Sequence, residues 1–265
     1  MRIACLQFDP QVGDVANNFT KAYAILAKAE PEDLDLLVLP EMAFSGYNFS
    51  SLEQITPYLE PTTSGVTSSW ARTTALKYSC VVTVGYPEKV DDALSRSSNP
   101  ECYNSTVTVD NEGKTIANYR KSFLYYTDET WAHEGSGFYC GIIKGLGTVA
   151  MGICMDLNPY KFETPWSTCE FACYVLQKKA NLVILSMAWL TRQDQLPYEI
   201  IVILANRCGT EGEATYAGTS TVLGIKDDEV NVYGILGRGE EKLLIVDTDE
   251  HPMAKIISGT KSTEI

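Results

Sequence analysis

Residues 34–41 read LDLLVLPE, a short and almost wholly apolar segment that ends in proline and glutamate. A strand with one face in water alternates apolar and polar residues, whereas a strand covered on both faces is apolar nearly throughout. The segment Leu34–Leu39 therefore predicts a strand in an inner layer of the domain. Val81–Tyr86, Thr148–Ile153 and Leu182–Leu185 have the same character.

Segments with helical spacing alternate with these strands, and the end of the chain is rich in strands. Asn17–Ala29 has apolar residues at helical intervals and is closed by Pro31. This order is typical of a layered α/β domain, and no linker divides residues 1–265, so we expect a single domain. The other expected helices are Ser51–Leu59, Ser64–Tyr78, Glu163–Lys179 and Tyr198–Cys208, and the other strands are Arg2–Phe8, Cys102–Val109, Thr115–Tyr119, Tyr216–Leu223, Val230–Leu236 and Lys242–Val246.

The net charge of −13 argues against binding to nucleic acid or to anionic membrane surfaces, because an acidic protein repels phosphate groups. No apolar stretch approaches the roughly 20 residues that a membrane-spanning helix needs. The eight cysteines include no CxxC pair, and a chain of this length does not need disulfides, which favours a reducing compartment. The opening MRIACLQFDP lacks the pattern of a signal peptide. We therefore expect a cytoplasmic protein.

Metal and cofactor motifs are missing from the sequence. His133 and His251 have no partners at ligand spacing, and Cys169 with Cys173 makes only half of a metal site. We expect no metal and no cofactor.

Three reactive residue types each follow the end of a predicted strand: Glu41, Lys121 and Cys154. The chain leaves the sheet at such points, so these side chains can meet in a crevice. Each residue alone is ordinary, since a glutamate after Leu-Pro often begins a loop and a cysteine after an apolar strand is often structural. Together they suffice for acyl transfer.

The chemistry of such a set starts from the thiol. A thiol attacks only as thiolate, so a neighbouring carboxylate must take the proton of Cys154, and Glu41 is the candidate. The positive charge of Lys121 then stabilises the anions that form, together with a backbone N–H. Glu41 returns the proton to the departing ammonia and later activates water.

The sequence around these residues resembles that of the carbon–nitrogen hydrolases, the nitrilase superfamily. LLVLPEMAFSGY, NYRKSFLYYTDE and GICMDLNPY are similar to the family's three motifs, in the same order and at separations of 80 and then 33 residues. The resemblance covers nearly the whole chain. It implies the roles of base for Glu41, of catalytic lysine for Lys121 and of nucleophile for Cys154.

The same resemblance implies further features. The fold is expected to be α/β, a four-layer α-β-β-α sandwich of the nitrilase type. A second glutamate, which orients the lysine, falls on Glu129, beside Asp128. The backbone N–H of Met155 belongs to the oxyanion hole. Many family members pair through their helical layers, so Glu163–Lys179 is the candidate face of a homodimer.

The stretches Tyr125–Glu129 and Met155–Glu163 are similar to those of the fungal N-terminal amidases within this family. This likeness implies removal of ammonia from the side chains of N-terminal Asn and Gln of peptides and proteins, which creates degradation signals in the N-degron pathway. A carboxylate is the natural partner of the peptide's α-ammonium group. The candidate substrate-binding residues are Asp156, Asn158, Tyr126, Trp189 and Glu163, with Glu129 as a further partner for the ammonium group.

Other functions stay open at this point. A small-molecule amidase, acting for example on dicarboxylate monoamides, has the same catalytic set but needs a cation for its substrate's carboxylate. A nitrile hydrolase or an N-acyl transferase has a related intermediate. A non-catalytic binding module on this fold is disfavoured by the complete catalytic set.

Overall fold

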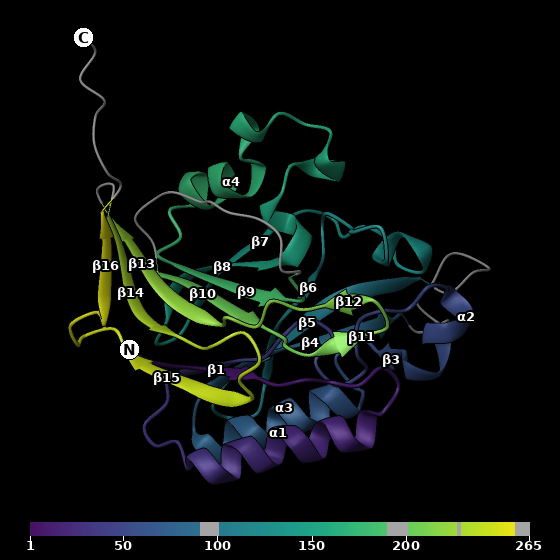
Figure 1. The fold of residues 1–265 in the computed structure, drawn as a ribbon, viewed down its shortest axis with the longest axis horizontal. Coiled ribbons are helices and arrows are strands. Elements are labelled where there is room, and N and C mark those ends of the chain that lie inside the picture. The colour runs from purple at the N-terminus through teal and green to yellow at the C-terminus, as the bar shows by residue number, and fades with distance from the viewer. Residues whose placement is uncertain (91–100, 190–200, 227–228, 258–265) are drawn as a thin grey trace.

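The computed structural model describes residues 1–90, 101–189, 201–226 and 229–257 of the chain. In this part of the chain, two seven-stranded sheets pack face to face, and helices cover their outer faces (Figure 1). The expected four-layer α-β-β-α sandwich is confirmed.

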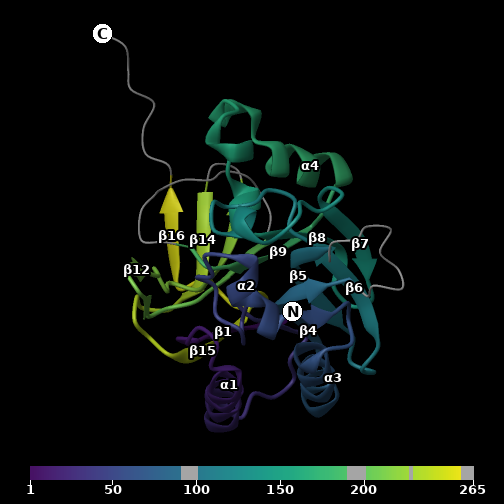
Figure 2. The same ribbon diagram turned by 90° about the vertical axis from the view of Figure 1, so that its right-hand side faces the viewer.

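The first sheet has the strand order β15-β1-β2-β4-β5-β6, with β3 paired to β4. β1, β2 and β4 are parallel to one another. Helices α1 and α3 lie side by side under this sheet, as Figure 2 shows. The bounds are β1 Arg2–Gln7, β2 Leu36–Val38, β3 Glu60–Pro61, β4 Val81–Lys89, β5 Cys102–Val109, β6 Thr115–Arg120, β15 Lys242–Asp247, α1 Val15–Ala29 and α3 Val66–Tyr78.

The second sheet has the order β16-β14-β13-β10-β9-β8-β7, and α4 lies over its outer face. β8, β9 and β10 are parallel. The bounds are β7 Tyr139–Ile143, β8 Gly147–Ile153, β9 Leu182–Met187, β10 Ile201–Asn206, β13 Thr221–Lys226, β14 Glu229–Ile235, β16 Ala254–Ile257 and α4 Glu170–Lys178. Outside the two sheets are the hairpin β11 Thr210–Glu211 and β12 Ala214–Thr215, helix α2 Leu52–Ile55 and the 3₁₀ turns η1 Thr56–Tyr58, η2 Asp128–Thr130, η3 Cys154–Leu157, η4 Tyr160–Phe162 and η5 Trp166–Thr168.

The inner strands are buried on both faces, as their apolar sequences predict. Along β2, Leu36 and Val38 pack into the core between the two sheets, while Leu37 packs into the core under α1 and α3. Alternation by one residue thus sends neighbouring side chains into two different cores. This burial on both sides leaves the ends of the strands as the places where polar side chains can lie in a crevice.

The predicted helix Tyr198–Cys208 is wrong for Ile201–Asn206, which forms β10 between β9 and β13. The run IVIL is apolar at every position, and such a run has no periodicity that separates a helix from a strand. Residues 198–200 lie outside the described part of the chain.

The predicted helix Glu163–Lys179 begins only at Glu170. Pro165 disfavours helical geometry at the residue before it, and the chain makes the 3₁₀ turn η5 before α4 starts. The expected strand Tyr216–Leu223 likewise begins only at Thr221, after two residues with positive φ.

In the described residues, no helix is long and apolar enough to cross a membrane.

The segment after β2 is held to both sheets. The N–H of Leu39 donates to the carbonyl oxygen of Thr83 (2.9 Å) in the first sheet, and the hydroxyl of Ser186 donates to the carbonyl of Leu39 (3.0 Å) from the second. Gly85 lies directly under the next turn. A Cβ atom at Gly85 would lie 2.6–2.8 Å from backbone atoms of residues 40–42.

We expect Gly85→Ala to displace the segment that carries Glu41, because the atoms it meets are backbone and cannot rotate away. The free energy of unfolding, measured in urea, should fall by about 1–3 kcal/mol, and the catalytic activity that the sequence leads us to expect should fall with it. Gly239→Ala is the matched control, since nothing lies within 4 Å of its added Cβ. Equal stabilities for the two variants would contradict the packing described here.

Candidate active site

Three segments that are distant in the sequence bring Glu41, Lys121 and Cys154 together. Glu41 follows β2, Lys121 follows β6 and Cys154 follows β8. The Nζ atom of Lys121 lies 2.7 Å from Oε1 of Glu41. Cys154 is close enough that the charges of both residues act on its thiol. The structure thus groups the three residues that the sequence singled out.

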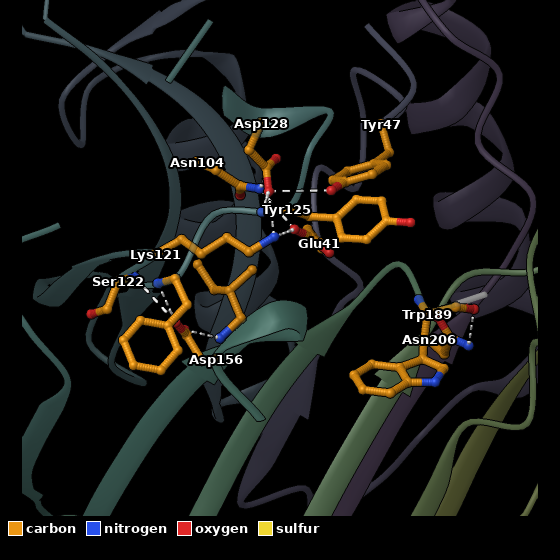
Figure 3. A network of polar contacts seen from close by, with 12 residues as sticks. Glu41, Tyr47, Asn104, Lys121, Ser122, Tyr125, Asp128, Asp156, Trp189 and Asn206 are labelled. Atoms are coloured by element: carbon orange, nitrogen blue, oxygen red, sulfur yellow. Dashed lines mark hydrogen bonds and ion pairs between the residues drawn. The ribbon is translucent and has the colours of Figure 1, made fainter. Parts of the chain in front are cut away.

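A second carboxylate, that of Asp128, binds Lys121 from the other side. Its Oδ2 lies 2.6 Å from Nζ, and all three charged side chains of this cluster are fully buried (Figure 3). The side-chain amide of Asn104 donates to Oε1 of Glu41 (2.7 Å) and to Oδ1 of Asp128 (3.0 Å). The hydroxyl of Tyr47 donates to Oδ2 of Asp128 (3.2 Å). A buried charge is tolerated only with such partners.

The Glu129 assignment is therefore corrected to its neighbour. The side chain of Glu129 is 41% exposed and lies 3.8 Å from the ammonium of Lys161. Residues 128–130 form the turn η2, in which successive side chains point in different directions, so only one of the two acids can face Lys121. The carboxylate that contacts Lys121 lies one residue before the position that the sequence spacing indicated.

Burial and charge set the proton affinities in this cluster. Burial raises the pKa of Glu41, although Lys121 acts in the opposite direction. Burial alone would lower the pKa of Lys121, but Asp128 and Glu41 outweigh it and raise that pKa. Burial and the charge of Glu41 together raise the pKa of the Cys154 thiol well above its usual value. At rest, the site holds an ammonium and a protonated thiol.

Cys154 stands at a sharp turn from β8 into η3. Its φ of +39° is in the left-handed region, which residues other than glycine rarely adopt. The carboxylate of Asp156 holds this turn. It accepts hydrogen bonds from the backbone N–H groups of Ile153 (2.7 Å) and Phe123 (2.8 Å) and from the hydroxyl of Tyr119 (2.7 Å).

These contacts correct the expectation that Asp156 binds substrate. It is fully buried and does not line the pocket, and burial raises its pKa to about 6. Its role is to fix the backbone around Cys154. Glu163 is exposed and also does not line the pocket.

A cavity of about 650 Å³ opens onto Cys154. Tyr126, Asn158, Trp189 and Met155, which the sequence singled out, are among the residues that line it. Met155 is the second residue of η3, where backbone N–H groups have no partner within the helical turn. Seven of the sixteen described lining residues are aromatic. Besides Cys154, the remaining described lining residues are Tyr47, Asn48, Tyr125, Thr127, Phe162, Trp166, Ala188, Glu213, Ala214, Thr215 and Tyr216.

Sequence reasoning missed Asn104, Tyr47 and Glu213. Asn104 had a usable signal, since it is a polar residue within the buried strand β5, where an unpaired amide would be costly. Tyr47 stands at the end of the first motif. Nothing in the sequence near Glu213 indicated that its hairpin reaches the pocket.

Among the described residues, no group of three or more His, Cys, Asp and Glu side chains is arranged to hold a metal ion.

Comparisons with known proteins show the family and the fold of the chain. Residues 2–158 match the family model of the carbon-nitrogen hydrolases. The chain is 31% identical to the protein N-terminal amidase of Schizosaccharomyces pombe, over 92% of this chain and 98% of that protein. Crystal structures of an N-terminal amidase, one with an Asn-Glu-Ala peptide and one with a Gln-Val peptide, each superimpose with a TM-score of 0.82 at 20% identity, covering 92% of this chain and 96% of the other.

The family match extends from β1 through the three motif residues to Asn158, and the curated relative aligns along almost its whole length. The chain therefore belongs to the carbon–nitrogen hydrolase family and is an amidase that hydrolyses carbon–nitrogen bonds.

Proposed function

We propose that this amidase removes ammonia from the side-chain carboxamide of N-terminal Asn and Gln residues of peptides and proteins. The observation that carries the proposal is the 31% identity to a protein N-terminal amidase along nearly the full length of both chains. The pocket supports it, because a cavity of about 650 Å³ is large enough for more than a free amino acid.

In the first half of the proposed reaction, Sγ of Cys154 attacks the amide carbon while its proton passes to Glu41. Oε2 of Glu41 is buried and has no hydrogen-bond partner among the described residues, so it is available for this proton. The ammonium of Lys121 and the N–H of Met155 stabilise the oxyanion. Glu41 then protonates the nitrogen, the C–N bond breaks, and ammonia leaves behind a thioester.

The second half hydrolyses the thioester. Glu41 takes a proton from water, whose oxygen attacks the carbonyl carbon, and the C–S bond breaks as the proton returns to the sulfur of Cys154. The product is the side-chain carboxylic acid of Asp or Glu, which then loses its proton to water. In this scheme Asp128 positions Lys121 and does not contact the substrate.

A small-molecule amidase acting on dicarboxylate monoamides is the second candidate. Its substrate carries a carboxylate, which calls for an Arg or Lys in the pocket. The described lining residues include neither. The pocket therefore favours a substrate that carries an ammonium group.

We further propose that the products, proteins with N-terminal Asp or Glu, serve as degradation signals in the N-degron pathway. The homodimer and the cytoplasmic location stay predictions from the sequence.

The proposal predicts ammonia release from Asn- and Gln-starting dipeptides, little release from their N-acetylated forms, and none from the Cys154→Ala protein. Free Asn, free Gln and dicarboxylate monoamides complete the panel. A coupled ammonia assay measures all of them. Turnover of the monoamides without turnover of the dipeptides would overturn the substrate assignment and leave the amidase chemistry intact.

The pH dependence of kcat/KM should report the raised pKa of Glu41. The base must be ionised, so activity should be lost as the pH falls through this pKa, at a higher pH than for an ordinary glutamate with a pKa of about 4.3. Glu41→Gln should lower kcat by about 10²–10⁴-fold and remove the acid limb from the remaining activity. An acid limb at the same pH in this variant would assign it to another group.

A paired substitution tests the position of the second carboxylate. Asp128→Asn removes the charge that contacts Lys121, and we expect kcat to fall by about 10²-fold or more. Glu129→Gln makes the same change one residue away, on an exposed side chain, and should leave kcat within about twofold of the wild type. The reverse order of effects would restore Glu129 as the partner of Lys121. Thermal unfolding of both variants separates this result from loss of fold.

A further inference from the structure

The carboxylates near the pocket differ in what they already bind. Glu41 and Asp128 are engaged with Lys121, and Asp156 with the backbone around the nucleophile. Glu213 lines the pocket and has no hydrogen bond or ion pair to any other described residue. It is also the one charged side chain among the described lining residues.

The hairpin that carries Glu213 is anchored by a different acid, Glu211. The Glu211 carboxylate accepts hydrogen bonds from the buried guanidinium of Arg207, from the hydroxyl of Tyr216 (2.9 Å) and from the backbone N–H groups of Asn48 (2.9 Å) and Tyr47 (3.4 Å). The hairpin β11–β12 is thus fastened to the loop that follows Glu41. Residues of both segments, the hairpin and the loop, line the pocket.

Glu213 stands in the turn of this hairpin, two residues after Glu211. Gly212 precedes it with a φ of +58°, which lets the chain reverse directly after the anchored residue. The anchor therefore limits how far the turn can move. The turn presents at the pocket a carboxylate without a partner among the described residues, and Tyr47 and Tyr216 line the same pocket.

We propose that Glu213 binds the α-ammonium group of the substrate's N-terminal residue. This inference rests on the proposed function and names the residue that selects free N-termini. An ammonium group bonds most strongly to a carboxylate, and the π faces of neighbouring aromatic rings also attract it. With no Lys or Arg in the described lining, nothing there competes with the substrate for Glu213.

This assignment replaces the partners that the sequence offered for the ammonium group. The oxygens of Asp156 are taken by backbone N–H groups and a tyrosine hydroxyl. Glu129 pairs with Lys161 and, like Glu163, does not line the pocket.

The test compares two substrates that differ only in the ammonium group. One is Asn-Val, and the other is succinamoyl-valine, which is Asn-Val without its α-amino group. kcat/KM for each is measured with the wild type, with Glu213→Gln and with the matched control Glu163→Gln. We expect Glu213→Gln to raise KM for Asn-Val about ten- to thirtyfold, with little change in kcat and no loss of activity on succinamoyl-valine. Glu163→Gln should keep the wild-type preference.

The pH gives a second readout. In the wild type, the ratio of kcat/KM for Asn-Val to that for succinamoyl-valine should fall as the pH rises through the pKa of the peptide's amino group, about 8. Titration of the enzyme's own catalytic groups cancels in this ratio. In Glu213→Gln the ratio should be low and nearly flat over the same range.

The outcomes separate the inference from the proposed function. If the wild type prefers Asn-Val and Glu213→Gln retains that preference, another group binds the ammonium and the inference is wrong. If the wild type hydrolyses both substrates equally, the ammonium is not recognised, which also overturns it while leaving peptides as substrates. If neither is hydrolysed while small monoamides are, the proposed function fails and the inference fails with it.

Discussion

The site depends on one buried ammonium, that of Lys121. An ammonium group without exposure to water is stable only when anions surround it, and here Glu41 and Asp128 lie 2.7 and 2.6 Å away. These residues come from three separate segments, so the ion cluster forms only when the end of β2, the end of β6 and the turn η2 are all in place. Asn104 joins both carboxylates from β5. The ion cluster therefore requires the first sheet to be folded, and the second sheet then adds Cys154 at the end of β8.

The described acids around the pocket divide into those that build the site and Glu213, which is available to recognise a ligand. Asp156 shapes the turn at Cys154, and Glu211 fastens the hairpin through Arg207. Both are deeply buried and fully engaged, so substitution would leave unpaired donors in the interior. Glu213 makes no such structural contact with the other described residues. Its carboxylate is exposed and has no partner among the described residues, so a cation can replace the water around it without breaking a contact seen there.

Sequence reasoning found the parts of the site that directly follow strands. Glu41 and Cys154 follow apolar strands, which are visible in a sequence because burial removes their polar residues. Lys121 follows β6, whose residues alternate between apolar and polar. Sequence reasoning chose Glu129 instead of Asp128. In a 3₁₀ helix, the side chains of successive residues point in directions that differ by about a third of a full rotation. Which acid faces inward depends on packing around the turn. β10 was predicted as a helix because an unbroken apolar run has no period.

The resting protonation state explains how a buried thiol can be both stable and reactive. Burial and Glu41 hold the pKa of Cys154 high, so the free enzyme keeps a neutral thiol, and the positive φ at Cys154 holds it in a strained turn beside its base. A thiolate formed without substrate would lie close to two carboxylates with only one ammonium to offset three negative charges. Proton transfer to Glu41 during attack avoids that state, because the proton neutralises the base while the new negative charge moves to the oxyanion. Lys121 then faces one neutral acid, Asp128 and the oxyanion, so it still offsets two negative charges, as it does at rest, and no third one forms beside it.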